Sequence, residues 1–253
     1  MGLVETEAII LRSYRLAEAD KIVIGLTKGA GVVRGVAHGA RRLKSKYGAS
    51  LEPFTHVALQ FYEKEGRELV SLRQVEILKS YFALAQNTEA VHALEYWSEL
   101  VLEFAPPHEP NEKLFRMVKA CVEALGEEPA RIEACARYFE VWMLKLAGFL
   151  PDLRACAVCG RSFTEGESVY VNLEQRLRCA ICSKRAGEEW SGQALTRMRM
   201  IRRLSPLEFA RANLDEESAV SQEMARITQR LIARALERTP RGQASFILAA
   251  SEK

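Results

Sequence analysis

Four of the six cysteines stand in two closely spaced pairs. The pairs read CAVC at 156–159 and CAIC at 179–182, which gives the spacing C-x2-C-x19-C-x2-C. Cysteines two residues apart can direct both sulfurs at one ion, and two such turns complete a tetrahedral site of four thiolates. A hairpin through SVYVN at 168–172 would bring the turns together. We therefore expect one Zn²⁺ bound by Cys156, Cys159, Cys179 and Cys182.

This zinc is expected to be structural. A hydrolytic zinc keeps one position open for water and usually has histidine or carboxylate ligands. Here cysteine fills all four positions, and no histidine follows His108. The alternative is a pair of redox-active CxxC motifs. A single metal site is the simpler explanation, because the spacing of the two pairs is that of a zinc ribbon. Cys121 and Cys135 fall on apolar helix faces and are expected in the core.

A second group of residues concentrates positive charge. The stretch GVAHGARRLKSKYGASLEPF at 35–54 lies within residues 21–51, which carry seven Lys or Arg and no Asp or Glu, although the whole chain has a net charge of only +3. Cations that follow phosphates, with aromatic rings that stack on bases, suit single-stranded nucleic acid. A solvated loop that only maintains solubility is the alternative. The expected DNA-binding residues are Arg34, Arg41, Arg42, Lys44, Lys46 and Tyr47.

The first eighty residues are expected to hold this loop on a small β-barrel. Turn signals such as KGAG at 28–31 separate five apolar, partly alternating stretches. Five short antiparallel strands with a long connection after the third indicate a barrel of the OB type, and the basic stretch is that connection. The predicted strands are Ala8–Leu11, Ile22–Leu26, Val32–Val36, Val57–Tyr62 and Leu69–Ile77.

From about residue 80 the apolar period becomes helical. Helices are predicted over 90–104, with Asn87 or Thr88 as the cap, and over 114–125, 132–146, 191–203, 205 onwards and 215–238. The fold class is thus α+β and multidomain. Residues 1–80 form an OB-type nucleic-acid-binding barrel. Residues 81–253 form a helical domain with a four-cysteine zinc-binding module inserted at 150–190.

The last predicted helix carries a row of arginines at a spacing of four residues: Arg226, Arg230, Arg234 and Arg238. This spacing places them along one face. The row is either a solvated face or a docking surface for nucleic acid or an acidic protein tail, and the sequence leaves both open.

Catalytic motifs are missing. The chain has no Walker A, GxSxG, HExxH or GxGxxG sequence, and its four histidines are far apart. An enzyme is therefore not expected. No apolar run reaches the length of a membrane span and no signal peptide opens the chain, so we expect a cytoplasmic protein without membrane contact.

Three stretches together resemble the RecO recombination mediators of bacteria. These are EAIILRSYRLAEADKIVIGLT at 7–27, the basic stretch at 35–54 and the cysteine pairs; the first contains Tyr14, Leu16, Glu18 and Asp20 as Y-x-L-x-E-x-D. The resemblance implies an OB barrel, a helical domain and a late zinc site. It also implies that Arg41, Arg42, Lys44 and Lys46 belong to a DNA-contacting loop. The last thirty or so residues carry no such match.

The function that the resemblance implies is repair of DNA gaps and breaks without enzymatic chemistry. Such proteins bind single- and double-stranded DNA and anneal complementary strands. With RecR they help to load RecA onto strands coated by single-stranded DNA-binding protein (SSB), whose acidic C-terminal tail they contact at a site that no motif locates here. They act in the bacterial cytoplasm, at the nucleoid during repair. The alternatives are a zinc-containing protein–protein adaptor without a direct DNA role and, more remotely, a zinc-dependent nuclease.

Overall fold

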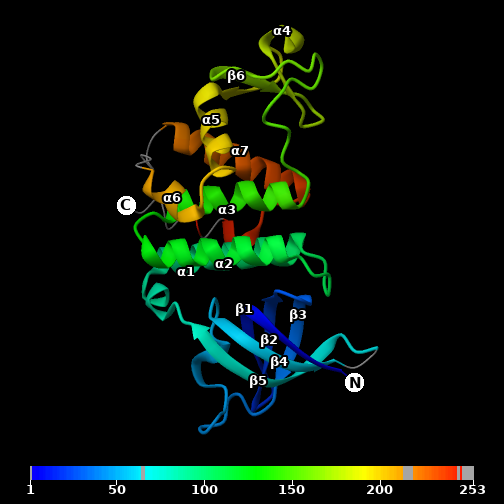
Figure 1. Cartoon of the computed structure of the whole chain (residues 1–253), viewed down its shortest axis with the longest axis vertical. Coiled ribbons are helices and arrows are strands. Elements are labelled where there is room, and N and C mark those ends of the chain that lie inside the picture. Colours follow the sequence, from blue (N-terminus) through cyan, green and yellow to red (C-terminus); the bar gives the residue numbers. More distant parts are fainter. Residues whose placement is uncertain (1, 64–65, 213–218, 244–245, 247–253) are drawn as a thin grey trace. The chain divides into compact units, whose positions relative to one another are not determined.

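A computed structural model describes residues 2–63, 66–212, 219–243 and 246. The chain divides into two compact units, which are described separately (Figure 1). The first comprises residues 1–126 and the C-terminal stretch from 241, and the second comprises residues 127–240.

Five strands form a closed barrel in the first unit (Figure 1). The order around the barrel is β1-β2-β3-β5-β4, with β4 pairing back onto β1. This order and the long connection between β3 and β4 are those of an OB-type barrel, so the predicted fold is confirmed. The strands are β1 (Gly2–Leu16), β2 (Asp20–Thr27), β3 (Gly31–Ala37), β4 (His56–Glu63) and β5 (Leu69–Lys79).

The barrel corrects the prediction in two respects. β1 is much longer than the predicted Ala8–Leu11, because its first half pairs with β4 and its second half with β2. A register irregularity between Ile10 and Arg12 bends the strand between these partners. The pairing of β3 with β5 is parallel, whereas we expected antiparallel strands throughout. A ring of five strands cannot alternate in direction all the way round, so one neighbouring pair must be parallel.

Inward-facing aliphatic side chains fill the barrel, as the alternation of apolar residues predicted. The core includes Ala8 and Ile10 from β1, Val33 from β3 and Phe61 from β4, none of which is more than 2% exposed. The barrel is therefore a packed support for its loops.

Helices α1 (Thr88–Phe104) and α2 (Glu112–Glu127) pack on the barrel. Asn87 caps α1 by accepting a hydrogen bond from the Ala90 N–H at 3.0 Å, as expected. Ser98 of α1 accepts a hydrogen bond from Arg12 Nε at 3.1 Å. Lys119 of α2 lies 3.7 Å from the Glu7 carboxylate. These helices therefore group with the barrel, and a separate domain formed by residues 1–80 alone stays a prediction.

In the second unit, helices α3 (Ile132–Leu146), α5 (Gly192–Ile201), α6 (Pro206–Arg211) and α7 (Ala219–Ala235) form a helical body. Ser191 caps α5, and Ser205 with Glu208 forms a capping box on α6, as the predicted helix starts require. The predicted last helix began at 215, but residues 215–218 lie outside the described residues. α7 is described from Ala219.

Between α3 and α5 the chain forms a small module of strands and turns. Its three-stranded sheet has the order β7-β6-β8, with β6 at Gly166–Val171, β7 at Leu177–Arg178 and β8 at Glu188–Ser191. A one-turn helix, α4 (Ala180–Ser183), follows β7 and lies at the end of the module farthest from α3 (Figure 1). The four-cysteine region thus falls between helices of the helical region, as predicted.

Candidate metal centre and nucleic-acid interface

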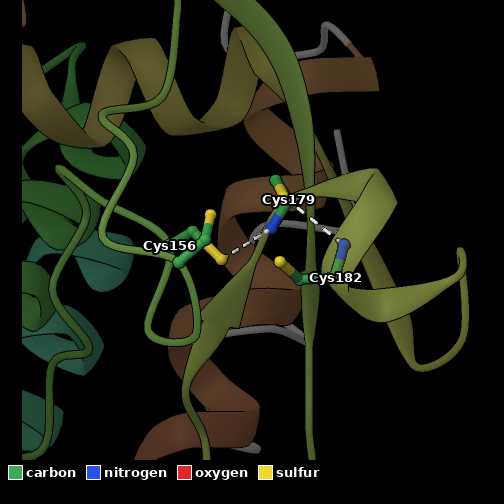
Figure 2. Close-up of side chains that lie close together, drawn as sticks. Cys156, Cys179 and Cys182 are labelled. Carbon is green, nitrogen blue, oxygen red and sulfur yellow. Dashed lines mark hydrogen bonds between the residues drawn. The ribbon is translucent and has the colours of Figure 1, made fainter.

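The four paired cysteines converge on one point. One Sγ atom from each of Cys156, Cys159, Cys179 and Cys182 lies within 4.8 Å of the other three. Figure 2 shows Cys156 approaching from one turn, and Cys179 and Cys182 from the other. Cys156 and Cys179 are buried, Cys182 is half-buried and Cys159 is exposed. The geometry is that of a four-sulfur metal site at the edge of the module.

Backbone hydrogen bonds hold the two turns against each other. The Cys179 N–H donates to Cys156 Sγ at 3.4 Å between the two turns, and the Cys182 N–H donates to Cys179 Sγ at 3.5 Å within the second turn (Figure 2). The Ala157 N–H donates to the Leu177 carbonyl at 2.8 Å, which ties the first turn to β7. Gly160, with φ +72°, lets the chain reverse direction directly after the first pair.

The electrostatics of the cluster fit a bound cation. Burial raises the pKa of the Cys156 thiol, but backbone hydrogen bonds from Cys159 and Cys179 outweigh burial and lower this pKa to about 6. The pKa of Cys182 is raised to about 12 by its side-chain hydrogen bonds with Cys159 and Cys179. Four thiolates this close therefore need an added positive charge to exist together, and a metal ion supplies it. The donor set of four sulfurs is the one that structural Zn²⁺ sites use.

An ion pair braces the first cysteine turn. Arg161 Nη1 donates to Glu167 at 3.0 Å, and Glu167 also accepts a hydrogen bond from the Thr164 N–H at 2.9 Å. The hydrogen bond from Arg161 is the main cause that lowers the pKa of Glu167 to about 2. The turn is thus fixed to the start of β6.

The basic loop runs from the end of β3 to the start of β4, and a carboxylate anchors its first residues. Asp20, at the start of β2, accepts a hydrogen bond from the Gly39 N–H at 2.8 Å and lies 2.9 Å from His38 Nδ1. The Gly39 hydrogen bond is the largest cause that lowers the pKa of Asp20. Arg41 adds a hydrogen bond from its guanidinium to the Ala17 carbonyl at 2.8 Å. The turn between β1 and β2 therefore fixes the loop where it leaves the barrel.

Asp20 is a functional candidate that residue types alone did not indicate. It appeared in the sequence only as the last residue of the Y-x-L-x-E-x-D stretch. It lies two residues before the apolar run of β2, and this position did not predict its hydrogen bond with Gly39, which follows β3.

The four cations of the loop are all exposed, and they surround a fully exposed leucine, Leu43. Lys46 Nζ donates to the Arg73 carbonyl of β5 at 2.5 Å. This hydrogen bond helps to stabilise the position of the loop on the barrel. Arg42 and Lys44 form no side-chain hydrogen bond or ion pair with the part of the chain that the structure describes. On β3, Arg34 is exposed and pairs with Glu68 at 3.2 Å.

Tyr47 does not fit the role expected for it. Its ring is only 4% exposed and packs in the barrel core, and its hydroxyl donates to the Leu72 carbonyl of β5 at 2.9 Å. A ring held inside the barrel cannot stack on a base, so the expectation that Tyr47 contacts DNA is wrong. Tyr14, 45% exposed on β1, has an accessible ring.

The arginine row of the last helix is partly used within its own unit. All four side chains are exposed, but Arg230 forms an ion pair with Glu188 of β8, and Arg234 donates to the Leu173 carbonyl. Arg238 lies beyond the end of α7. Two of the four arginines thus connect the helical body to the cysteine module, which favours a structural role for them.

A cationic loop on an OB-type barrel, followed by helices that carry a four-cysteine cluster, defines the class of OB-barrel proteins with a helical, cysteine-containing second part. Two family models match the chain: "Recombination protein O N terminal" over residues 1–81 and "Recombination protein O C terminal" over residues 85–244. The chain therefore belongs to the RecO family of DNA repair and recombination proteins, which are non-enzymatic recombination mediators.

Curated relatives agree with this assignment. The chain is 34% identical over 187 residues to a protein of Koribacter versatilis, with 74% of this chain and 75% of the relative covered. It is 33% identical over 183 residues to a protein of Anaeromyxobacter sp. (strain K), with 72% of each chain covered. It is 32% identical over 185 residues to a protein of Geobacter metallireducens, with coverage of 73% and 74%. All three are named DNA repair protein RecO.

Among the described residues, no helix has both the length and the apolar character that crossing a bilayer requires.

Proposed function

We propose that this chain is a recombination mediator that binds single- and double-stranded DNA through its basic loop and anneals complementary strands. One observation carries the proposal: Arg42 and Lys44 are exposed on a loop whose base Asp20 fixes, and neither side chain forms a hydrogen bond or ion pair with a described residue. Arg41 and Lys46, also exposed on the loop, add to this positive charge, and Arg34 on β3 would contribute once released from Glu68.

Annealing requires no bond to be made or broken. Two strands repel each other through their phosphates, and bound cations reduce this repulsion. Contacts confined to the phosphate backbone leave the base edges free to pair. The loop offers guanidinium and ammonium groups at exposed positions, which suits this role.

The proposal includes the partners that the family resemblance implies. With RecR, the chain helps to load RecA onto strands coated by SSB, and it contacts the acidic C-terminal tail of SSB. It works in the bacterial cytoplasm. One Zn²⁺ bound by the four cysteines stabilises the inserted module and takes part in no reaction, because sulfur fills every coordination position.

The test is the salt dependence of binding to a fluorescent oligothymidine. If the loop and its neighbours meet about six phosphates, log affinity falls with log salt at a slope of about −4. The double variant R42Q/K44Q should bind more weakly and reduce the slope by about 1.4, because it removes two phosphate contacts. The variant K113Q/R116Q, which removes two exposed cations from α2, is the matched control.

Annealing of complementary strands, measured by fluorescence transfer, should fall in R42Q/K44Q and not in the control. Affinity and slope that stay unchanged in R42Q/K44Q would contradict the loop's role. That result would favour the protein–protein adaptor, in which the loop charges only maintain solubility.

A further inference from the structure

The two cysteine turns expose apolar side chains that the metal site does not require. Val158 lies between the first pair of cysteines and is 64% exposed, and Ile181 lies between the second pair and is 84% exposed. The neighbouring positions hold the small residues Ala157 and Ala180. Side chains this exposed are accessible to a ligand.

Two cations follow the second turn. Lys184 and Arg185 are exposed, and neither forms a side-chain hydrogen bond or ion pair with any described residue. Other exposed cations of the module are paired: Arg154 with Asp152 at 2.9 Å, Arg161 with Glu167, and Arg176 with Glu174 at 3.8 Å. We call Val158, Ile181, Lys184 and Arg185 the knuckle tip.

The backbone at these cations is in an unusual conformation. Lys184 ends α4 with φ +52° and Arg185 follows with φ +59°, so two consecutive residues occupy the left-handed region. Glycine is the residue that adopts this conformation without strain. The chain places long cationic side chains there, where glycine would give the more relaxed turn. Strain kept at a surface position points to a role for the side chains themselves.

We propose that the knuckle tip is a second polynucleotide-binding surface, distinct from the basic loop. Lys184 and Arg185 meet phosphates, and Val158 and Ile181 contact the faces of unstacked bases. An exposed apolar edge beside two cations suits an extended polyanion with exposed bases, whereas acidic peptides are recognised by clusters of arginines, and the tip has only one, Arg185. The proposal rests on the proposed function only in taking the ligand to be a polynucleotide.

A competing explanation assigns the cations to the metal site. Four thiolates around Zn²⁺ carry a net charge of −2. Nearby cations lower the electrostatic free energy of this charge. In that case, loss of Lys184 and Arg185 would weaken zinc binding. The two explanations therefore differ in whether zinc content or DNA affinity responds.

The test uses the full-length zinc-loaded chain and the variant K184G/R185G. Glycine suits both backbone positions, so the melting temperature and the zinc content should not fall. Affinity for oligothymidine should fall, and the salt slope should decrease by about 1.4 for two lost phosphate contacts. The control R154Q/R176Q removes two paired cations from the same module and should leave affinity unchanged.

A second variant, V158S/I181S, separates the apolar contribution. It should weaken binding while leaving the salt slope unchanged, because it removes no ionic contact. The proposal is overturned if K184G/R185G keeps full affinity, if it loses zinc, or if R154Q/R176Q loses as much affinity. R42Q/K44Q tests the basic loop independently. The proposal for the knuckle tip and the proposal for the basic loop can therefore be contradicted separately.

Discussion

Asp20 is an acidic residue at the base of the loop that we propose as the DNA contact. Its carboxylate lies beside a cationic loop, where its charge alone would repel phosphate. It also accepts the Gly39 N–H and contacts His38, which fixes the base of that loop. If the loop binds DNA as proposed, the position and the charge of Asp20 should have opposite effects on the affinity for DNA.

Replacing Asp20 by alanine tests which effect is larger. We expect Asp20→Ala to weaken oligothymidine binding several-fold, because the loop loses its anchor. Asp20→Asn keeps an oxygen acceptor for the Gly39 N–H and should restore much of the affinity. Tighter binding by both variants would show that charge dominates and that the anchor is unimportant.

Tyr47 offers a second test at a single residue. Burial raises the pKa of its hydroxyl, so the folded state resists ionisation that the unfolded chain undergoes near pH 10. Its stabilising contribution is complete below pH 10 and is lost as the pH rises further.

Tyr47→Phe should reduce the free energy of unfolding at pH 7 by about 1 kcal/mol, through loss of the hydrogen bond to Leu72. Above pH 10 the variant should lose less stability than the parent. Its DNA affinity at pH 7 should be unchanged, since the ring is buried. Denaturant titrations at both pH values measure the first two effects, and a loss of affinity would reinstate Tyr47 as a DNA contact.

At the scale of elements, α1 holds a segment from the far end of the chain. Glu99 on α1 is 8% exposed and accepts hydrogen bonds from the Arg241 and Gly242 N–H groups at 3.1 and 2.8 Å. A Cβ on Gly242 would lie 2.9 Å from the Tyr96 Cα, so only glycine allows this close approach. The C-terminal stretch thus belongs to the barrel unit.

Glu99→Ala should therefore destabilise the first unit. It leaves two part-buried backbone N–H groups without their acceptor, and loss of a hydrogen bond to a charged group costs about 1.5–3 kcal/mol. We expect a lower melting temperature with oligothymidine affinity unchanged at a temperature where the variant is folded. Glu95→Ala, at an exposed position elsewhere on α1, is the control. An unaltered melting temperature in Glu99→Ala would show that the C-terminal stretch adds no stability.

Local sequence patterns predicted those features of the fold that depend on residues close together in the chain. Alternation located the strands, Asn87 and Ser191 marked helix starts, and the cysteine spacing predicted the four-sulfur cluster, all of which the structure confirms. These signals act within a few residues, and they need no knowledge of distant neighbours.

Contacts between distant residues were not predictable in this way. Tyr47 is buried because β5, twenty-five residues further on, supplies its partner Leu72. Asp20 meets Gly39 through pairing of β2 with β3. In both cases the contact depends on which strands are neighbours in the barrel. The sequence patterns predicted the strands but not their order, so they did not predict these contacts.

At the scale of the whole molecule, the four-cysteine cluster and the basic loop belong to different compact units. Removal of zinc by a chelator should therefore unfold the module around residues 156–182 and leave the barrel intact, because site formation and local folding are coupled. Circular dichroism should show a partial loss of structure. Oligothymidine binding should persist with only the knuckle-tip contribution lost, whereas complete loss of binding would mean that zinc supports the barrel as well.

The strand order of the barrel has one more consequence. β3 and β4 are not neighbours, since β5 lies between them. The connection that carries the cations must therefore pass over β5, and the bonds from Lys46 to Arg73 and from Tyr47 to Leu72 mark that crossing. Residues inserted beside Leu43 would only enlarge the exposed bend. A deletion long enough to prevent the crossing would leave the ring of strands unable to close, so the positively charged segment also has a minimum length set by barrel closure.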